Sequence, residues 1–263
     1  MDPETRLDSI KKFKYRHRDV LICSYPKTGT HWVFNLVNSL MSPGPVEDKL
    51  IPSPELLDLH PLEKIEQLSS PRVIVSHLKP IRLPQEHLKN GGKIILVARN
   101  PRDTIVSHMY HTQRMEIFNY SKLSWNCFFD NWIDGKIPTG SYFDYYNSWQ
   151  SAIEEPNCQL NVLIVKYENL IKDGVSEMIK IQNFLGTNNT EERIVQILER
   201  FSLKRLTLKG DNGEEQNDLE ATVNMVKKGV IGHWKDKFTA RQCEVFDRII
   251  QHKFSNSVFN YDM

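Results

Sequence analysis

The chain has 263 residues and a formal net charge of +1, so its length fits one large α/β domain that buries a core of ordinary size. A charge balance this close to zero provides no bulk attraction to nucleic acid or to a membrane surface. Any anion-binding site must therefore be local.

Cysteine usage and the N-terminal residues indicate a reducing compartment. The four cysteines are far apart, with no C-x-x-C pair and no grouping with histidine at metal-ligand spacing, and we expect reduced thiols. The N-terminus carries no apolar signal core, and no stretch approaches the roughly 20 apolar residues that span a bilayer. These features predict a soluble, cytoplasmic protein without a bound metal.

The first predicted strand leads into a turn and a helix. Residues 20–23 form a short apolar run, which is typical of a parallel strand covered on both faces. Pro26 ends the extended segment, and Gly29 lets the backbone approach a ligand closely. Residues 30–40 carry apolar side chains at helical spacing. This pattern predicts a strand–turn–helix unit.

The turn is a candidate phosphate cradle. The free N–H groups of the helix, together with Lys27 and the hydroxyls of Thr28 and Thr30, are expected to converge on one anion. The spacing is not that of a Walker A motif, because the lysine precedes the glycine. Taken alone, the segment is equally compatible with a βα unit that has only a structural role.

Three further short apolar runs are predicted to be strands: residues 71–77, 93–98 and 160–168. Ligands of open α/β sheets bind at the carboxyl ends of the strands. His77 ends the first of these runs, Arg99 follows the second, and Tyr167 ends the third. We therefore expect these three side chains at the working edge of the sheet.

The remaining segments are interpreted as helices and connections. Helices are predicted from Pro101, at residues 175–185 and 190–201, and from about residue 239 to 254. The connections comprise a basic run interpreted as a solvated lead-in (11–18), a proline-rich excursion (41–61), an aromatic, largely helical region (110–150), a polar loop (207–222) and a second candidate anion clamp (226–235). The expected fold is a single α/β domain whose central sheet is mostly parallel and has helices on both faces.

Three motifs in this order resemble those of the cytosolic sulfotransferases. The string at 25–32 resembles the family's 5′-phosphosulfate loop, which binds the donor 3′-phosphoadenosine-5′-phosphosulfate (PAPS). The string at 97–103, followed by Ser107, resembles its 3′-phosphate site. Residues 227–229 and 232–234 resemble a later R-K-G and G-x-W segment, with Lys227 in place of the arginine.

The resemblance implies a P-loop-like sulfotransferase domain over residues 1–263, PAPS as co-substrate and adenosine 3′,5′-bisphosphate (PAP) as product, with no metal. Arg99 and Ser107 match the residues that hold the 3′-phosphate, Trp32 and Leu203 match those that stack on adenine, and Tyr167 matches a tyrosine that binds it. The full set of implied donor-binding residues is Lys27, Thr28, Gly29, Thr30, His31, Trp32, Arg99, Ser107, Tyr167, Leu203, Lys227, Lys228 and Gly229.

The same resemblance makes His77 the expected general base and Lys27 the cation that stabilises the leaving group. Two departures from the family concern these residues. Val75 precedes Ser76 and His77 where the family has lysine, and His31 replaces the usual threonine or serine of the loop. The contribution of the missing lysine and the effect of the extra histidine are left open.

Two other functions compete with sulfuryl transfer. A small-molecule kinase is disfavoured because no lysine follows the glycine and no Mg²⁺-binding acid of the Walker B type is identifiable. A catalytically silent nucleotide-binding protein is favoured by the altered motif before His77 and disfavoured by the presence of both Lys27 and His77.

The expected partner is a small-molecule acceptor, with phenols, biogenic amines and steroid-like alcohols all open. Residues 235–244 resemble the family's dimerisation segment, with Ala240 where the family has valine, so we expect at most a weak homodimer. Thr239 also fits the N-cap of the last helix.

Overall fold

The computed structural model describes residues 2–42, 44, 46, 53–114, 122–156, 160–202, 231–254 and 257–259. Its sheet has four strands: β1 (Val20–Ser24), β2 (Val73–Ser76), β3 (Lys93–Ala98) and β4 (Val162–Lys166). They pair in the order β2-β1-β3-β4, and all three pairings are parallel. The carboxyl ends of the four strands therefore meet at one edge, as the sequence predicts.

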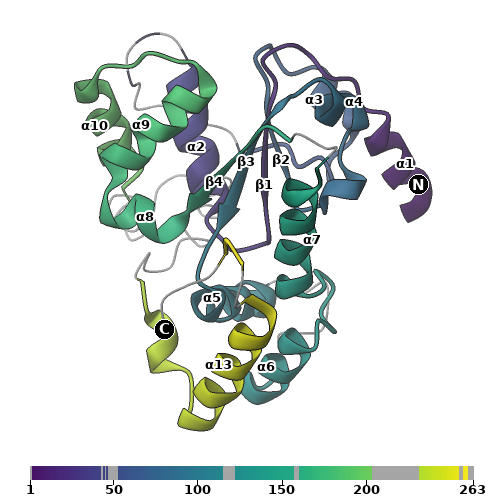
Figure 1. The fold of residues 1–263 in the computed structure, drawn as a ribbon, viewed down its shortest axis with the longest axis vertical. Helices are drawn as coiled ribbons and strands as arrows, with labels where there is room; N and C mark the ends of the chain where they lie inside the picture. The colour runs from purple at the N-terminus through teal and green to yellow at the C-terminus, as the bar shows by residue number, and fades with distance from the viewer. Residues whose placement is uncertain are drawn as a thin grey trace.

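Helices cover both faces of this sheet (Figure 1). One face is covered by α2 (Thr30–Met41), α8 (Tyr167–Lys172), α9 (Gly174–Leu185) and α10 (Glu191–Arg200). The other face and its surroundings carry α1 (Pro3–Lys11), α3 (Leu62–Glu66), η1 (Pro80–Arg82), α4 (Gln85–Lys89), α5 (Pro101–Arg114), α6 (Trp125–Ile133), α7 (Tyr142–Glu154), η4 (His233–Asp236) and α13 (Ala240–Phe254). The predicted single α/β domain is confirmed.

The two faces have separate hydrophobic cores because successive strand residues point in opposite directions. Val20 and Ile22 pack with α2, α9 and α10, whereas Leu21 and Cys23 pack with the aromatic side chains of α6 and α7. All five residues of β1 are buried. A continuous apolar run is thus what this central strand requires.

The structure corrects several sequence-based boundaries. β4 ends at Lys166, and Tyr167 is the first residue of α8 rather than the end of a strand. Helices α1, α3 and α4 were not predicted, because two of them have only five residues and α1 has a weak apolar face. The start of α1 has a recognisable signal, since the Asp2 carboxylate accepts hydrogen bonds from the N–H groups of Glu4 and Thr5.

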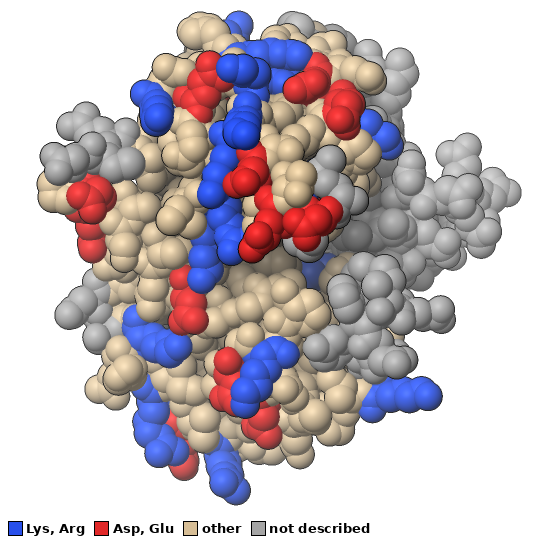
Figure 2. All heavy atoms as spheres, turned by 90° about the vertical axis from the view of Figure 1, so that its right-hand side faces the viewer, with Lys and Arg blue, Asp and Glu red and all other residues tan. Residues whose placement is uncertain are grey.

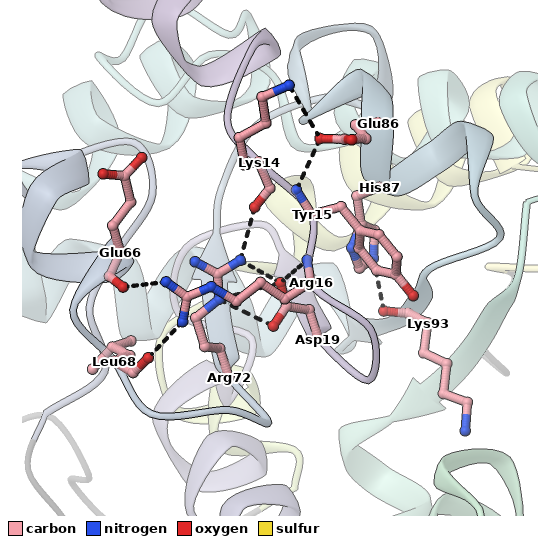
Figure 3. Close-up of polar contacts among 10 residues, drawn as sticks. All are labelled: Lys14, Tyr15, Arg16, Asp19, Glu66, Leu68, Arg72, Glu86, His87 and Lys93. Atoms are coloured by element: carbon pink, nitrogen blue, oxygen red, sulfur yellow. Dashed lines mark hydrogen bonds and ion pairs between the residues drawn. The ribbon is translucent and has the colours of Figure 1, made fainter.

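The basic lead-in to β1 is not a solvated arm. Arg72 of the β2 side is 2% exposed and donates to the equally buried Asp19 carboxylate (Figure 3). Arg16 donates to the carbonyl oxygens of Leu68 and Glu66. These arginines fix the segment before β1 to the segment before β2 at the amino ends of the strands. The interpretation of residues 11–18 as solvated is therefore wrong for Arg16.

Charges on the face that includes α1 and α4 are mixed in sign (Figure 2). A shallow groove there is lined by Lys11, Lys12, Lys14 and Lys89, and Glu86 lies among them. Lys14 is 3.9 Å from Glu86, and Lys11 is 3.9 Å from Asp8 on α1. Exposed pairs of this kind contribute little stability, and they dilute the positive charge of the groove.

Candidate active site

The turn between β1 and α2 has a backbone that favours close approach. Gly29 has φ +100° and precedes the first residue of α2, and no side chain caps this helix. A Cβ atom at Gly29 would lie 2.6 Å from the ring of Tyr167. Lys27 also has a positive φ, +71°. The first N–H groups of α2 have no partner within the helix and form an anion-binding end.

The two threonine hydroxyls of the turn contact the protein itself. The Thr28 hydroxyl is fully buried and donates to the Tyr25 carbonyl at 2.7 Å. The Thr30 hydroxyl lies 2.6 Å from the Ser24 hydroxyl. Thr28 is thus left with its backbone N–H for anion binding, which differs from the expectation that its hydroxyl faces the ligand. Both hydroxyls stabilise the shape of the turn.

His77 is held in one ring orientation at the end of β2. Its Nδ1 lies 2.8 Å from the Ser24 carbonyl oxygen, and its backbone N–H donates to Asp58 Oδ1 at 3.0 Å. Because a carbonyl only accepts hydrogen bonds, Nδ1 carries the ring proton. Nε2 then bears the lone pair. This is the tautomer that a general base needs.

Lys27, His31 and His77 share one electrostatic neighbourhood. Burial, together with the charges of Lys27 and His77, lowers the pKa of His31 to about 4. His31 is therefore neutral at physiological pH. Burial, together with the charges of Lys27, His111 and His77, lowers the pKa of His108 on α5 to about 3. The cationic charge of the neighbourhood is thus carried by Lys27 and not by these histidines.

Arg99 joins the turn to the next strand end. Its Nη1 donates to the Lys27 carbonyl at 3.2 Å, and its guanidinium lies 4.4 Å from the centre of the Tyr167 ring. The Tyr142 hydroxyl donates to the Arg99 carbonyl at 2.6 Å. Arg99 Nε is buried and has no hydrogen-bond partner among the described residues. A fixed guanidinium with a spare donor suits a phosphate group.

Trp32 and Tyr167 form the aromatic side of this region. Their ring centroids are 5.3 Å apart in an edge-to-face arrangement. Trp32 Nε1 is buried and, like Arg99 Nε, has no hydrogen-bond partner within the described chain. Buried donors without acceptors are costly unless a ligand completes them. The two donors and the tight turn at Gly29 fit a bound anionic ligand with an aromatic part.

The structure brings together most of the predicted residues that it describes. Lys27, His31 and His77 interact electrostatically, Arg99 contacts both the turn and Tyr167, and Trp32 contacts Tyr167. Ser107 is half-buried on α5, and no recorded contact joins it to Arg99. The predicted residues Leu203, Lys227, Lys228 and Gly229 lie outside the described residues.

Three functional contacts were missed from the sequence. Ser24 fixes the His77 ring, Asp58 binds the His77 backbone, and Asp103 accepts from the N–H groups of Gly232 at 2.8 Å and Trp234 at 3.1 Å. Asp103 stands in the matched 97–103 motif, and its position in the first turn of α5 was a usable signal. Asp58 gave no signal, because its segment lacks periodicity.

The described residues contain no group of three or more histidine, cysteine, aspartate or glutamate side chains arranged to hold a metal ion. None of the helices described is both long and apolar enough to cross a membrane.

Comparisons with known proteins agree on one family. The sulfotransferase domain family matches residues 17–258. Human sulfotransferase 1C2 is 30% identical over 272 residues, covering 97% of this chain and 89% of that protein. The 3-beta-hydroxysteroid sulfotransferase of Cavia porcellus is 31% identical over 269 residues, covering 96% and 89%. The crystal structure of mouse sulfotransferase SULT7A1 complexed with PAP matches with a TM-score of 0.80 and 28% identity, covering 97% of this chain and 91% of that one.

Acid should destabilise the fold through His108. This imidazole is 2% exposed, accepts a hydrogen bond from Trp132 Nε1 at 3.2 Å, and has its pKa lowered from 6.5 to about 3. Below pH 6.5 the unfolded chain binds a proton here that the native chain does not. The contribution of His108 to the free energy of unfolding is therefore fully present above pH 6.5. It falls by about 1.4 kcal/mol per pH unit as the pH drops toward 3.

Urea unfolding between pH 7 and 5 tests this, because carboxylates contribute less in that range. His108→Asn keeps an acceptor for Trp132. Its unfolding free energy should fall less steeply with decreasing pH than that of the wild type, and the difference between the two slopes should correspond to about one bound proton. His252→Asn, on the exposed surface of α13, controls for the loss of an imidazole. Identical slopes for the wild type and His108→Asn would contradict the assignment.

Proposed function

The chain belongs to the sulfotransferase family as a PAPS-dependent enzyme, and from that premise we propose that it transfers a sulfuryl group to a hydroxyl or amine of a small-molecule acceptor. The observation that carries the proposal is the ring of His77, held through Nδ1 so that Nε2 is a proton acceptor in the neighbourhood of Lys27. The acceptor classes are phenols, biogenic amines and steroid-like alcohols, and the proposed location is the cytoplasm.

The donor has two anionic ends, and the residues near β1 and β3 suit one end each. The turn with Lys27, Gly29 and the start of α2 suits the phosphosulfate. Arg99 suits the 3′-phosphate, because its guanidinium is fixed and has a buried Nε without a partner among the described residues. Trp32 and Tyr167 suit the adenine. We include Ser107 and the predicted residues at 203 and 227–229 in this donor site.

Sulfuryl transfer breaks the bond between sulfur and the donor's bridging oxygen while a bond from sulfur to the acceptor forms. His77 Nε2 accepts the proton that the acceptor hydroxyl loses. The Lys27 ammonium stabilises the negative charge that develops on the leaving oxygen. The neutral state of His31 keeps it from competing with Lys27 as a cation. Positioning and charge stabilisation together are the protein's contribution.

Binding of the 3′-phosphate should depend on Arg99. PAP should bind roughly ten- to a hundredfold more tightly than adenosine 5′-phosphate, since hydrogen bonds to a charged group contribute about 1.5–3 kcal/mol. Arg99→Ala should bring the two affinities together, and Arg82→Ala, an exposed arginine of η1, should leave the ratio unchanged. Calorimetry measures both. Equal wild-type affinity for the two nucleotides would refute this donor site.

Removing the proposed base should separate chemistry from donor binding. His77→Ala should lower kcat by about 10²–10⁴-fold with nearly unchanged affinity for PAP, whereas Lys27→Ala should impair both. Transfer of labelled sulfate from PAPS across phenols, amines and sterols gives the rates, with His252→Ala as control. If His77→Ala keeps most of the wild-type rate, the base lies elsewhere. If no acceptor in the panel is sulfated, the chain is catalytically silent.

We also propose a weak homodimer through residues 235–244. Lys235, Thr239, Ala240 and Glu244 are all exposed, which supports their availability. The Thr239 hydroxyl accepts from the Gln242 N–H at 3.2 Å and so caps α13 as well. Capping and pairing are compatible, because a cap uses one side of the threonine.

Ala240→Val should tighten this dimer. Adding two methyl groups on each subunit at about 0.8 kcal/mol apiece changes the interface by about 3 kcal/mol, more than a hundredfold in dissociation constant. Sedimentation at micromolar concentrations should show a concentration-dependent wild type and a more dimeric variant. A tight wild-type dimer that Ala240→Val does not alter would show that another surface holds the subunits together.

A further inference from the structure

We propose that Asp58 selects acceptors that carry an ammonium group a short distance from the hydroxyl that reacts, an inference that rests on the proposed sulfuryl transfer. Asp58 lies in the segment before α3, which runs alongside β2. Leu57 N–H donates to the Val75 carbonyl at 2.8 Å, and an isolated parallel bridge joins Leu56 to Val75. This pairing brings the Asp58 carboxylate to the backbone N–H of His77 at 3.0 Å.

The carboxylate is thus placed at the strand end that carries the proton acceptor. His77 Nδ1 is committed to the Ser24 carbonyl, so the reacting hydroxyl must come to Nε2. An acceptor bound there has Asp58 within reach of its nearby substituents, because the Asp58 carboxylate binds the backbone N–H of the same residue that carries Nε2. Because the acceptor is a small molecule, its reacting oxygen and its charged substituent lie only a short distance apart.

Asp58 lacks a cationic partner within the described residues. It is half-buried, it accepts a hydrogen bond from the His77 backbone N–H, and no lysine, arginine or histidine of the described residues forms an ion pair with it. A carboxylate taken partly out of water is costly unless a cation or several donors stabilise it. A ligand ammonium would supply the missing charge.

The charge of Asp58 reaches the aromatic wall on α7. Burial raises the pKa of Tyr145 well above its ordinary value, and the negative charge of Asp58 raises it further. The same two causes raise the pKa of Cys23 on β1. Tyr145 and Cys23 both belong to the core beneath this strand end. The Asp58 carboxylate thus lies within electrostatic range of β1 and α7.

Two buried donors on α7 complete the surroundings. The Tyr145 hydroxyl, on a side chain only 3% exposed, lies near the Trp149 indole, yet neither Tyr145 Oη nor Trp149 Nε1 has a hydrogen bond of good geometry with a described residue. An acceptor with a hydroxyl and an ammonium group matches Nε2 and the carboxylate together.

A matched pair of acceptors tests the inference. Tyramine and 4-ethylphenol share a phenol and a two-carbon side chain and differ in the ammonium group. The wild type should show a kcat/KM for tyramine at least tenfold above that for 4-ethylphenol. Asp58→Asn, which keeps an oxygen acceptor for the His77 N–H, should lower this ratio tenfold or more. Taking the ratio cancels any disturbance of His77 that affects both acceptors.

Asp130→Asn is the control, because this exposed acid of α6 removes the same charge without contacting β2. Its ratio should equal that of the wild type. A wild-type ratio near one, or an Asp58→Asn ratio equal to the wild-type one, would overturn the inference even though sulfuryl transfer itself occurs. A wild-type ratio near one refutes the inference without any variant, so poor folding of Asp58→Asn cannot hide a failure.

Binding separates this inference from the proposed function. Calorimetry in the presence of PAP should show that tyramine binds the wild type at least tenfold more tightly than 4-ethylphenol and that Asp58→Asn loses this difference. If no acceptor is sulfated but this binding preference is present, the proposed reaction fails and the ammonium site stands. If sulfation occurs without the preference, the ammonium site fails and the reaction stands.

Discussion

The hydrogen bond between the His77 ring and the Ser24 carbonyl is the contact on which the site depends. It exists because β1 and β2 pair in parallel with Cys23 opposite Ser76, so both strands end at the same level. The bond fixes the tautomer of His77 and leaves Nε2 as the proton acceptor. Since Ser24 also contacts Thr30 at the start of α2, one residue couples the proton acceptor to the anion-binding turn.

Around this contact, the lysine of the turn is charged and two nearby histidines are neutral. Lys27 remains the cation of the turn, whereas His31 and His108 are kept neutral by burial and by the positive charges near them. A protonated His31 would place a second mobile charge beside the reacting group. Burial thus lets the chain carry several imidazoles near the proposed anion site without adding their positive charge to that of Lys27.

Sequence reasoning recovered what is encoded locally. The apolar run of β1, Gly29 and the apolar spacing of α2 predict the strand–turn–helix, because each feature has a direct backbone cause. The contacts of Asp58 and Arg16 were beyond reach, since they depend on which segments lie beside β2 and before it. Their neighbours are set by tertiary pairing that no local pattern encodes.

Two acidic side chains, Glu168 and Asp103, lie near the proposed anion site because each binds backbone N–H groups there. Glu168 accepts from the Asn100 N–H at 2.8 Å, and Asp103 accepts from two N–H groups of the segment that contains Trp234. Glu168 thus fixes the backbone next to Arg99, and Asp103 fixes the segment that contains Trp234. Burial raises the pKa of Glu168, while the Asn100 bond and the charge of Arg99 lower it. Within the described residues neither carboxylate forms an ion pair with the Arg99 guanidinium, which leaves it available for the proposed phosphate.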